Sequence, residues 1–130
     1  MRLEKYITEA RKDELYHVTT YKNAINILKH RYFRPSPGIV GIKGLSTTTN
    51  PNYWWGSKEV RFVLDSKKLS RKYKLKKVEE PIGVKEDEVK IVTNDIIKNI
   101  EEYIIRVEYF KNREFKSFIE DINDIVFKSL

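Results

Sequence analysis

Four short groups of side chains in this 130-residue chain have types suited to chemistry. They are an imidazole with a nearby hydroxyl, a hydroxyl pair, an aromatic pair and a carboxylate: His17 with Thr19, Ser46 with Thr48, Tyr53 with Trp54, and Glu88. An imidazole can hold a ligand through a ring nitrogen, and aromatic rings can stack on a planar group. Each group also has a structural reading. The imidazole can fill a strand, the hydroxyls can serve turns, the rings can fill a core, and the carboxylate can belong to a solvated acidic patch.

Composition removes several classes of site. The chain has no cysteine, which excludes thiolate zinc sites, iron-sulfur clusters and cysteine nucleophiles. It has only two histidines, too few for most all-histidine metal sites, so we do not expect a metal centre. No apolar run approaches the roughly 18 residues that would cross a bilayer. With 40% hydrophobic and 12% aromatic residues, we expect one packed domain over residues 1–130, soluble and cytoplasmic.

The net charge of +7 is concentrated in one segment. Nine basic residues and two acids lie between Lys58 and Lys77, so this segment alone carries a charge equal to that of the whole chain. Such a field attracts phosphates, which favours a nucleic acid or a nucleotide as partner. A solvated lysine-rich face is the alternative, because lysines outnumber arginines 18 to 8 and forked base contacts are typical of arginine.

The elements that must position these groups are two helices near the start of the chain and a series of short strands. Apolar spacing predicts helices over residues 3–10 and 21–30, the second capped by Thr20, with a strand over 15–19 between them. After a loop rich in proline and glycine over 34–44, the chain becomes extended again at "LSTTT". Further strands are predicted over the ranges 60–64, 73–78, 88–92 and 103–109.

The late strands and the C-terminus complete an expected α+β fold. We expect the inward positions of the last two strands to be Val89, Ile91, Ile105 and Val107. After Asn112, a suitable cap, an amphipathic helix is predicted from the apolar face that begins at Phe115. Helices near both ends, with strands between them, favour an α+β domain.

Three segments together resemble a known family. "LYHVTT" followed by "NAINILKH", then "GLSTTTNPNYWW", then "EDEVKIVTNDIIKNIEEYIIRV" are similar, in this order, to small ADP-ribosyltransferases of the His-Tyr-Glu class. This class contains the diphtheria toxin and poly(ADP-ribose) polymerase branches. The segment "FVLDSKKLSRKYKL" also resembles uncharacterised phage and bacterial sequences. The resemblance covers residues 15–107 and implies a split β-sheet core.

The resemblance implies a site for NAD. His17 would bond a ribose hydroxyl, Tyr53 or Trp54 would stack on the nicotinamide, and Ser46 would brace the site. Glu88 would bond the ribose 2′-hydroxyl and stabilise the cation that develops as nicotinamide leaves. The implied residues that bind NAD are His17, Thr19, Ser46, Thr48, Tyr53 and Trp54, and those that act in catalysis are His17, Tyr53 and Glu88.

Three departures from the family pattern stand out. Val18 occupies a position where glycine is frequent, which alters close backbone approach to NAD. Thr49 stands where related sequences have an arginine, so Lys43 or Arg61 would have to contact the phosphates. Glu86 lies two residues before Glu88, which makes it a candidate helper on the same face of an extended strand.

The implied function is NAD-dependent transfer of a single ADP-ribose unit to a macromolecular acceptor, in a phage or toxin-like setting. The basic segment between Lys58 and Lys77 puts nucleic acid slightly ahead of protein as acceptor. Two alternatives stay open. One is a catalytically silent module of the same fold that binds or inhibits a host protein. The other is a basic nucleic-acid-binding domain whose aromatic residues stack on bases.

Overall fold

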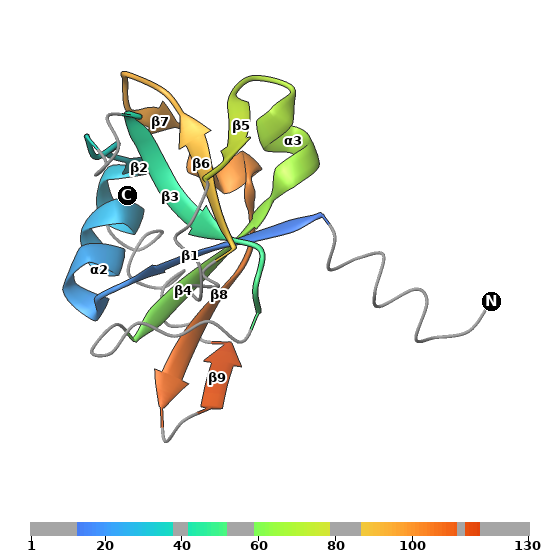
Figure 1. Ribbon diagram of the computed structural model, residues 1–130. Coiled ribbons are helices and arrows are strands. Elements are labelled where there is room, and N and C mark those ends of the chain that lie inside the picture. Colours follow the sequence, from blue (N-terminus) through green and yellow to red (C-terminus); the bar gives the residue numbers. More distant parts are fainter. Residues whose placement is uncertain (1–12, 38–41, 52–58, 79–86, 112–113, 118–130) are drawn as a thin grey trace.

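The computed structural model describes residues 13–37, 42–51, 59–78, 87–111 and 114–117 (Figure 1). The expected α+β class is confirmed, because an antiparallel seven-stranded sheet packs with helices and a small two-stranded sheet. In chain order the elements are β1 (Glu14–Thr19), α2 (Tyr21–His30), β2 (Tyr32–Phe33), β3 (Gly44–Thr48), β4 (Val60–Asp65), α3 (Ser66–Ser70), β5 (Lys74–Lys77), β6 (Glu88–Val92), β7 (Ile97–Lys98), η1 (Ile100–Glu102), β8 (Ile104–Lys111) and β9 (Glu114–Ser117). In these described residues no helix is long and apolar enough to span a membrane.

The large sheet has the order β5-β6-β3-β1-β4-β8-β9 and consists of two halves. β1 pairs with β4 along its whole length, and β3 pairs with β6 along its whole length. Between β1 and β3, in contrast, the pairing is a single position, Tyr16 opposite Thr48. Figure 1 shows the two strands crossing near the centre and then diverging. We call β1, β4, β8 and β9 the β4 half, β3, β6 and β5 the β6 half, and the divergence the ladder break.

The first strand and its helix form as predicted. Thr20 follows β1 and caps α2, since its Oγ1 accepts a hydrogen bond from the Asn23 amide at 3.2 Å. Arg31 ends the helix in a left-handed conformation, with φ of 62°. Ala24 and Leu28 face the sheet and are buried. They join an apolar core that runs under both halves and includes Leu15, Phe33, Leu45, Phe62, Leu64, Ile91, Ile97 and Val107.

The short helix α3 was not predicted. Asp65 caps it, since its carboxylate accepts a hydrogen bond from the Lys68 amide at 3.1 Å. Leu69 anchors it at 1% exposure. A five-residue helix with one apolar anchor shows no periodicity, so sequence pattern does not reveal it.

Two predictions about the last strands were wrong. Ile105 is 45% exposed instead of inward-facing, because Val63 pairs with Arg106 while Leu64 pairs with Ile104. The extra residue is a β-bulge, which reverses the alternation on one side of it. In addition, residues 114–117 form β9 where the C-terminal helix was expected to begin. The rest of that helix and the predicted N-terminal helix lie outside the described residues.

Candidate functional site

His17 lies on β1 beside the ladder break. Its Nδ1 is 2.8 Å from the Ser46 carbonyl oxygen of β3. A carbonyl only accepts hydrogen bonds, so Nδ1 carries the hydrogen and Nε2 of the neutral ring is an acceptor. The ring packs edge-on against Phe33, with centroids 5.5 Å apart, and near Phe62. This packing and the Nδ1 bond fix the imidazole in one orientation.

Ser46 connects β3 to a residue that sequence reasoning missed. The buried Lys90 side chain donates from Nζ to Ser46 Oγ at 2.9 Å. Ser46 and Lys90 are direct partners across β3 and β6. The spacing in the sequence could have indicated Lys90, because it lies two residues after Glu88 on one strand and the two side chains must share a face of the sheet. Lys90 therefore places a positive charge on the face of the candidate carboxylate.

Glu88 opens β6, as predicted, and is half-buried. Its carbonyl accepts a hydrogen bond from the Val78 amide at 3.0 Å, at the end of β5. The preceding carbonyl, that of Asp87, accepts from the Thr49 amide at 3.1 Å. Asp87 has a φ of 50°, a conformation that aspartate tolerates better than most residues. The main chain at Glu88 is thus attached to strands on both sides.

The two predicted threonines take part in local structure. Thr48 is buried, and its Oγ1 accepts a hydrogen bond from the Asn50 amide at 3.1 Å, which turns the chain after β3. Thr19 is buried at the end of β1, where its carbonyl accepts from the Glu59 amide at 3.2 Å. Both threonines therefore belong to the ends of the strands on which the site would be built.

These residues come from adjacent strands but differ in face. Tyr16, Thr48 and Glu88 are successive direct partners across β1, β3 and β6, so their Cβ atoms share a face. Alternation turns the Cβ atom of His17 to the opposite face. The His17 ring nevertheless reaches a β3 carbonyl, which lies in the plane of the ladder. The imidazole is therefore beside the ladder break, where β1 and β3 no longer pair.

The predicted aromatic residues, Tyr53 and Trp54, and the possible helper Glu86 lie outside the described residues. The described chain reaches Pro51, just before the aromatic segment. The Pro51 carbonyl accepts a hydrogen bond from Arg61 Nη1. Arg61 thus bonds the last described residue before the aromatic segment.

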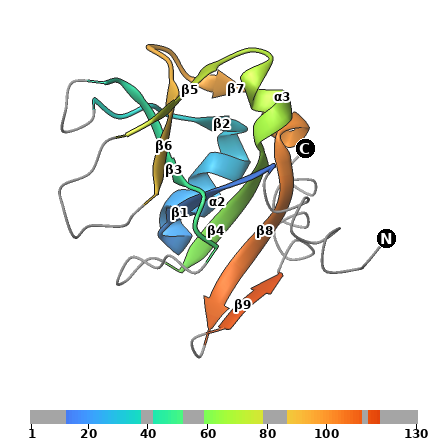
Figure 2. The same ribbon diagram turned by 45° about the vertical axis from the view of Figure 1, so that its right-hand side comes forward.

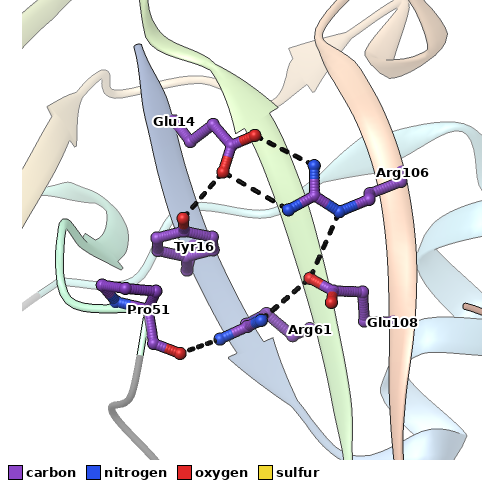
Figure 3. A network of polar contacts seen from close by, with 6 residues as sticks. All are labelled: Glu14, Tyr16, Pro51, Arg61, Arg106 and Glu108. Atoms are coloured by element: carbon purple, nitrogen blue, oxygen red, sulfur yellow. Dashed lines mark hydrogen bonds and ion pairs between the residues drawn. The ribbon is translucent and has the colours of Figure 1, made fainter. Parts of the chain in front are cut away.

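Arg61 belongs to a polar network on one face of the β4 half (Figure 3). Its guanidinium is 2.9 Å from Glu108 Oε1 and lies over the Tyr16 ring, 4.6 Å from the centroid. Arg106 bonds Glu14 at 2.9 Å and also approaches Glu108. The suggestion that Arg61 contacts NAD phosphates is therefore not favoured, because the side chain is buried and its charge is already matched by Glu108.

Tyr16 is buried within this network, away from solvent. Its hydroxyl donates to Glu14 Oε2 at 2.7 Å. Burial, together with the hydrogen bond to Glu14 and its negative charge, raises the pKa of Tyr16 to about 12. The phenol is therefore neutral over the whole physiological range.

In the described part of the chain, no group of three or more His, Asp or Glu side chains is placed where it could hold a metal ion. The chain matches no protein-family model, no curated protein and no solved structure.

Proposed function

We propose that this protein is an NAD-dependent mono-ADP-ribosyltransferase acting on a macromolecular acceptor. One observation carries the proposal. Four of the residues that the resemblance assigns to the site, although far apart in sequence, lie on the adjacent strands β1, β3 and β6 close to the ladder break: His17, Ser46, Thr48 and Glu88. A large sheet joined by one paired position is also what a split β-sheet core requires.

Main-chain groups beside the break suit a carboxamide. The Thr19 carbonyl points toward β4, since it accepts from the Glu59 amide, so alternation turns the Val18 peptide groups toward β3. The Ser46 carbonyl points toward β1, and the Ser46 N–H shares that direction. The nicotinamide carboxamide has both a donor and an acceptor, which such peptide groups complement. Because this contact uses only main chain, valine in place of glycine at position 18 is compatible with it.

The side chains have complementary roles in the reaction. His17 Nε2 accepts a hydrogen bond from a ribose hydroxyl, with the ring held by its Nδ1 bond to Ser46. Glu88 places negative charge near the ribose as the bond between C1′ and the nicotinamide nitrogen breaks. The bonding electrons leave with nicotinamide, the acceptor atom bonds to C1′, and the acceptor loses a proton. Lys90 positions the Ser46 hydroxyl, and Tyr53 or Trp54 supplies the stacking ring.

The test is transfer of label from NAD. Purified protein is incubated with NAD labelled in its adenylate part and with DNA, RNA or cell lysate. We expect Glu88→Gln to lower transfer about 100-fold or more, the usual size for loss of a group that stabilises charge in the transition state. Glu102→Gln, an exposed glutamate on η1, is the matched control and should leave transfer unchanged. Full transfer by the Glu88→Gln protein would sink the proposal.

A second candidate function, nucleic-acid binding without catalysis, is favoured by the exposed lysines of α3 and β5. It differs from the first in its response to NAD. A binding domain of this kind would neither consume NAD nor gain thermal stability from it, and it would shift oligonucleotides in the absence of NAD. A silent module that binds a host protein would also leave NAD unchanged and would not shift oligonucleotides.

A further inference from the structure

Seven of the nine cations in the basic segment between Lys58 and Lys77 are exposed in the structure. Lys58 lies outside the described residues, and Arg61 is buried and paired with Glu108. The other seven cations are all exposed: Lys67, Lys68, Arg71, Lys72, Lys74, Lys76 and Lys77. They lie on α3, on β5 and in the turn between them, which both views place together at one end of the molecule (Figures 1 and 2). We call these seven residues the basic edge.

The described stretch that carries the basic edge has no acidic residue of its own. Residues 66–78 contain none, and Asp65 uses its carboxylate to cap α3. Lys67 forms an exposed ion pair with Asp13 at 3.2 Å, and Asp95 acts electrostatically on Tyr73, which lies between the cations. A solvated stretch normally mixes both signs of charge, whereas residues 66–78 carry seven cations and no acid.

The pairing of β5 directs two of these lysines to the face of the candidate site. Lys76 is the direct partner of Lys90, and Lys74 is the direct partner of Val92. Direct partners share a face, and Lys90 shares its face with Glu88. Lys74 and Lys76 therefore project on the same side of the sheet as the Glu88 carboxylate, one strand away. Leu75, between them, faces the core.

Lysines on an edge strand also keep sheets from pairing with one another, and β5 is an edge strand. That role requires cations on the strand itself. It does not account for Lys67, Lys68, Arg71 and Lys72, which extend the charge over α3 and the following turn. It also does not account for the absence of acids over residues 66–78.

We propose that the basic edge binds the phosphate backbone of a nucleic acid and presents it to Glu88 as the acceptor. The excess of lysine over arginine suits phosphate contacts that carry no base specificity. An acidic protein would meet the same charge, but it offers discrete carboxylates, whereas a nucleic acid offers a continuous line of phosphates along an edge. The choice of acceptor rests on the proposed function, whereas the binding itself does not.

The experiment measures binding without NAD. Fluorescence anisotropy follows oligothymidylate, its RNA counterpart and a duplex over a series of salt concentrations, with polyglutamate as competitor. For single strands, Lys74→Gln with Lys76→Gln should lower the slope of log affinity against log salt by about 1.4, since each phosphate contact contributes about 0.7. The control, Lys22→Gln with Lys29→Gln on α2, changes the net charge equally at exposed positions and should leave the slope unchanged.

Three results would overturn the inference: equal slope changes in both double variants, no change in either, or polyglutamate that competes as well as the oligonucleotides. Glu88→Gln separates this inference from the proposed function. Oligonucleotide binding by this variant and by the wild type, with no label transfer by either, would refute the transferase and leave the basic edge. Transfer at the wild-type rate by the Lys74→Gln, Lys76→Gln protein would refute the basic edge and leave the transferase.

Discussion

The two halves of the sheet use charge in opposite ways. In the β4 half, Arg61 and Glu108 have side chains only 7% and 13% exposed and pair with each other, within a network that also holds Glu14, Tyr16 and Arg106. In the β6 half, Lys90 is buried against Ser46, but Lys74 and Lys76 are exposed and Glu88 is half-buried. The first arrangement fixes neighbouring strands, whereas the second presents charge to solvent. Paired charges that join strands and exposed charges can therefore be separated by strand within one sheet.

The largest loss of stability is expected when charge is removed from the β4 half. Glu108→Gln should lower the free energy of unfolding by about 3 kcal/mol, because it leaves the buried Arg61 guanidinium without its negative partner. Urea unfolding measures the change. Glu101→Gln, at an exposed position on η1, is the control and should change stability by less than about 0.5 kcal/mol. An equal effect of the two variants would mean that the network does not stabilise this half.

Alkaline pH should weaken the same half through Tyr16. The folded pKa of about 12 lies above the ordinary 10.0, so the stabilisation is complete below pH 10 and is lost as pH rises toward 12. A difference of this size corresponds to about 2–3 kcal/mol. Tyr16→Phe, which cannot ionise, should lose less stability over this range than the wild type when unfolding is followed at each pH. Parallel losses would show that other groups cause the alkaline unfolding.

A smaller effect is expected in the β6 half. Ser46→Ala removes the acceptor of the Lys90 ammonium bond inside the fold, at a cost of about 1–2 kcal/mol. Thermal unfolding measures the cost, with the exposed Ser70→Ala as control. If the site is as proposed, NAD-dependent transfer should fall in Ser46→Ala even at temperatures where the protein is fully folded. Retained transfer would confine Ser46 to a structural role.

The smallest effect concerns the bulge in β8. Ile105→Thr should change the free energy of unfolding by less than about 0.5 kcal/mol, because the side chain is 45% exposed. Val107→Thr, two residues further on, is the comparison and should cost more than about 1 kcal/mol, since this side chain is buried in the core. A larger loss of stability in Ile105→Thr than in Val107→Thr would place the bulge elsewhere on β8.

Local pattern predicted most of the strands and α2, because alternation and capping depend on near neighbours. β6 begins and ends at the predicted residues, and Thr20 caps α2 as expected. The errors concern long-range relations. Arg61 was counted with the basic surface although its partner Glu108, 47 residues away, neutralises it within the fold. Lys90 was missed because its partner Ser46 is 44 residues away.

The location of the candidate site could not be predicted from pattern alone. That β1, β3 and β6 are neighbours is a property of the sheet order, which no local periodicity specifies. The resemblance implied a common site but not the face of each side chain. The opposite Cβ directions of His17 and Glu88 follow only from the register of the ladder.

The attachment of the chain at Glu88 has a consequence for how such a protein can change over time. Its hydrogen bonds to β3 and β5 use peptide groups at positions 87 and 88, so they form whatever side chain stands at position 88. A descendant that exchanged this carboxylate would retain its architecture. Under the proposed function, loss of catalysis through this position would therefore leave the sheet and its basic edge intact.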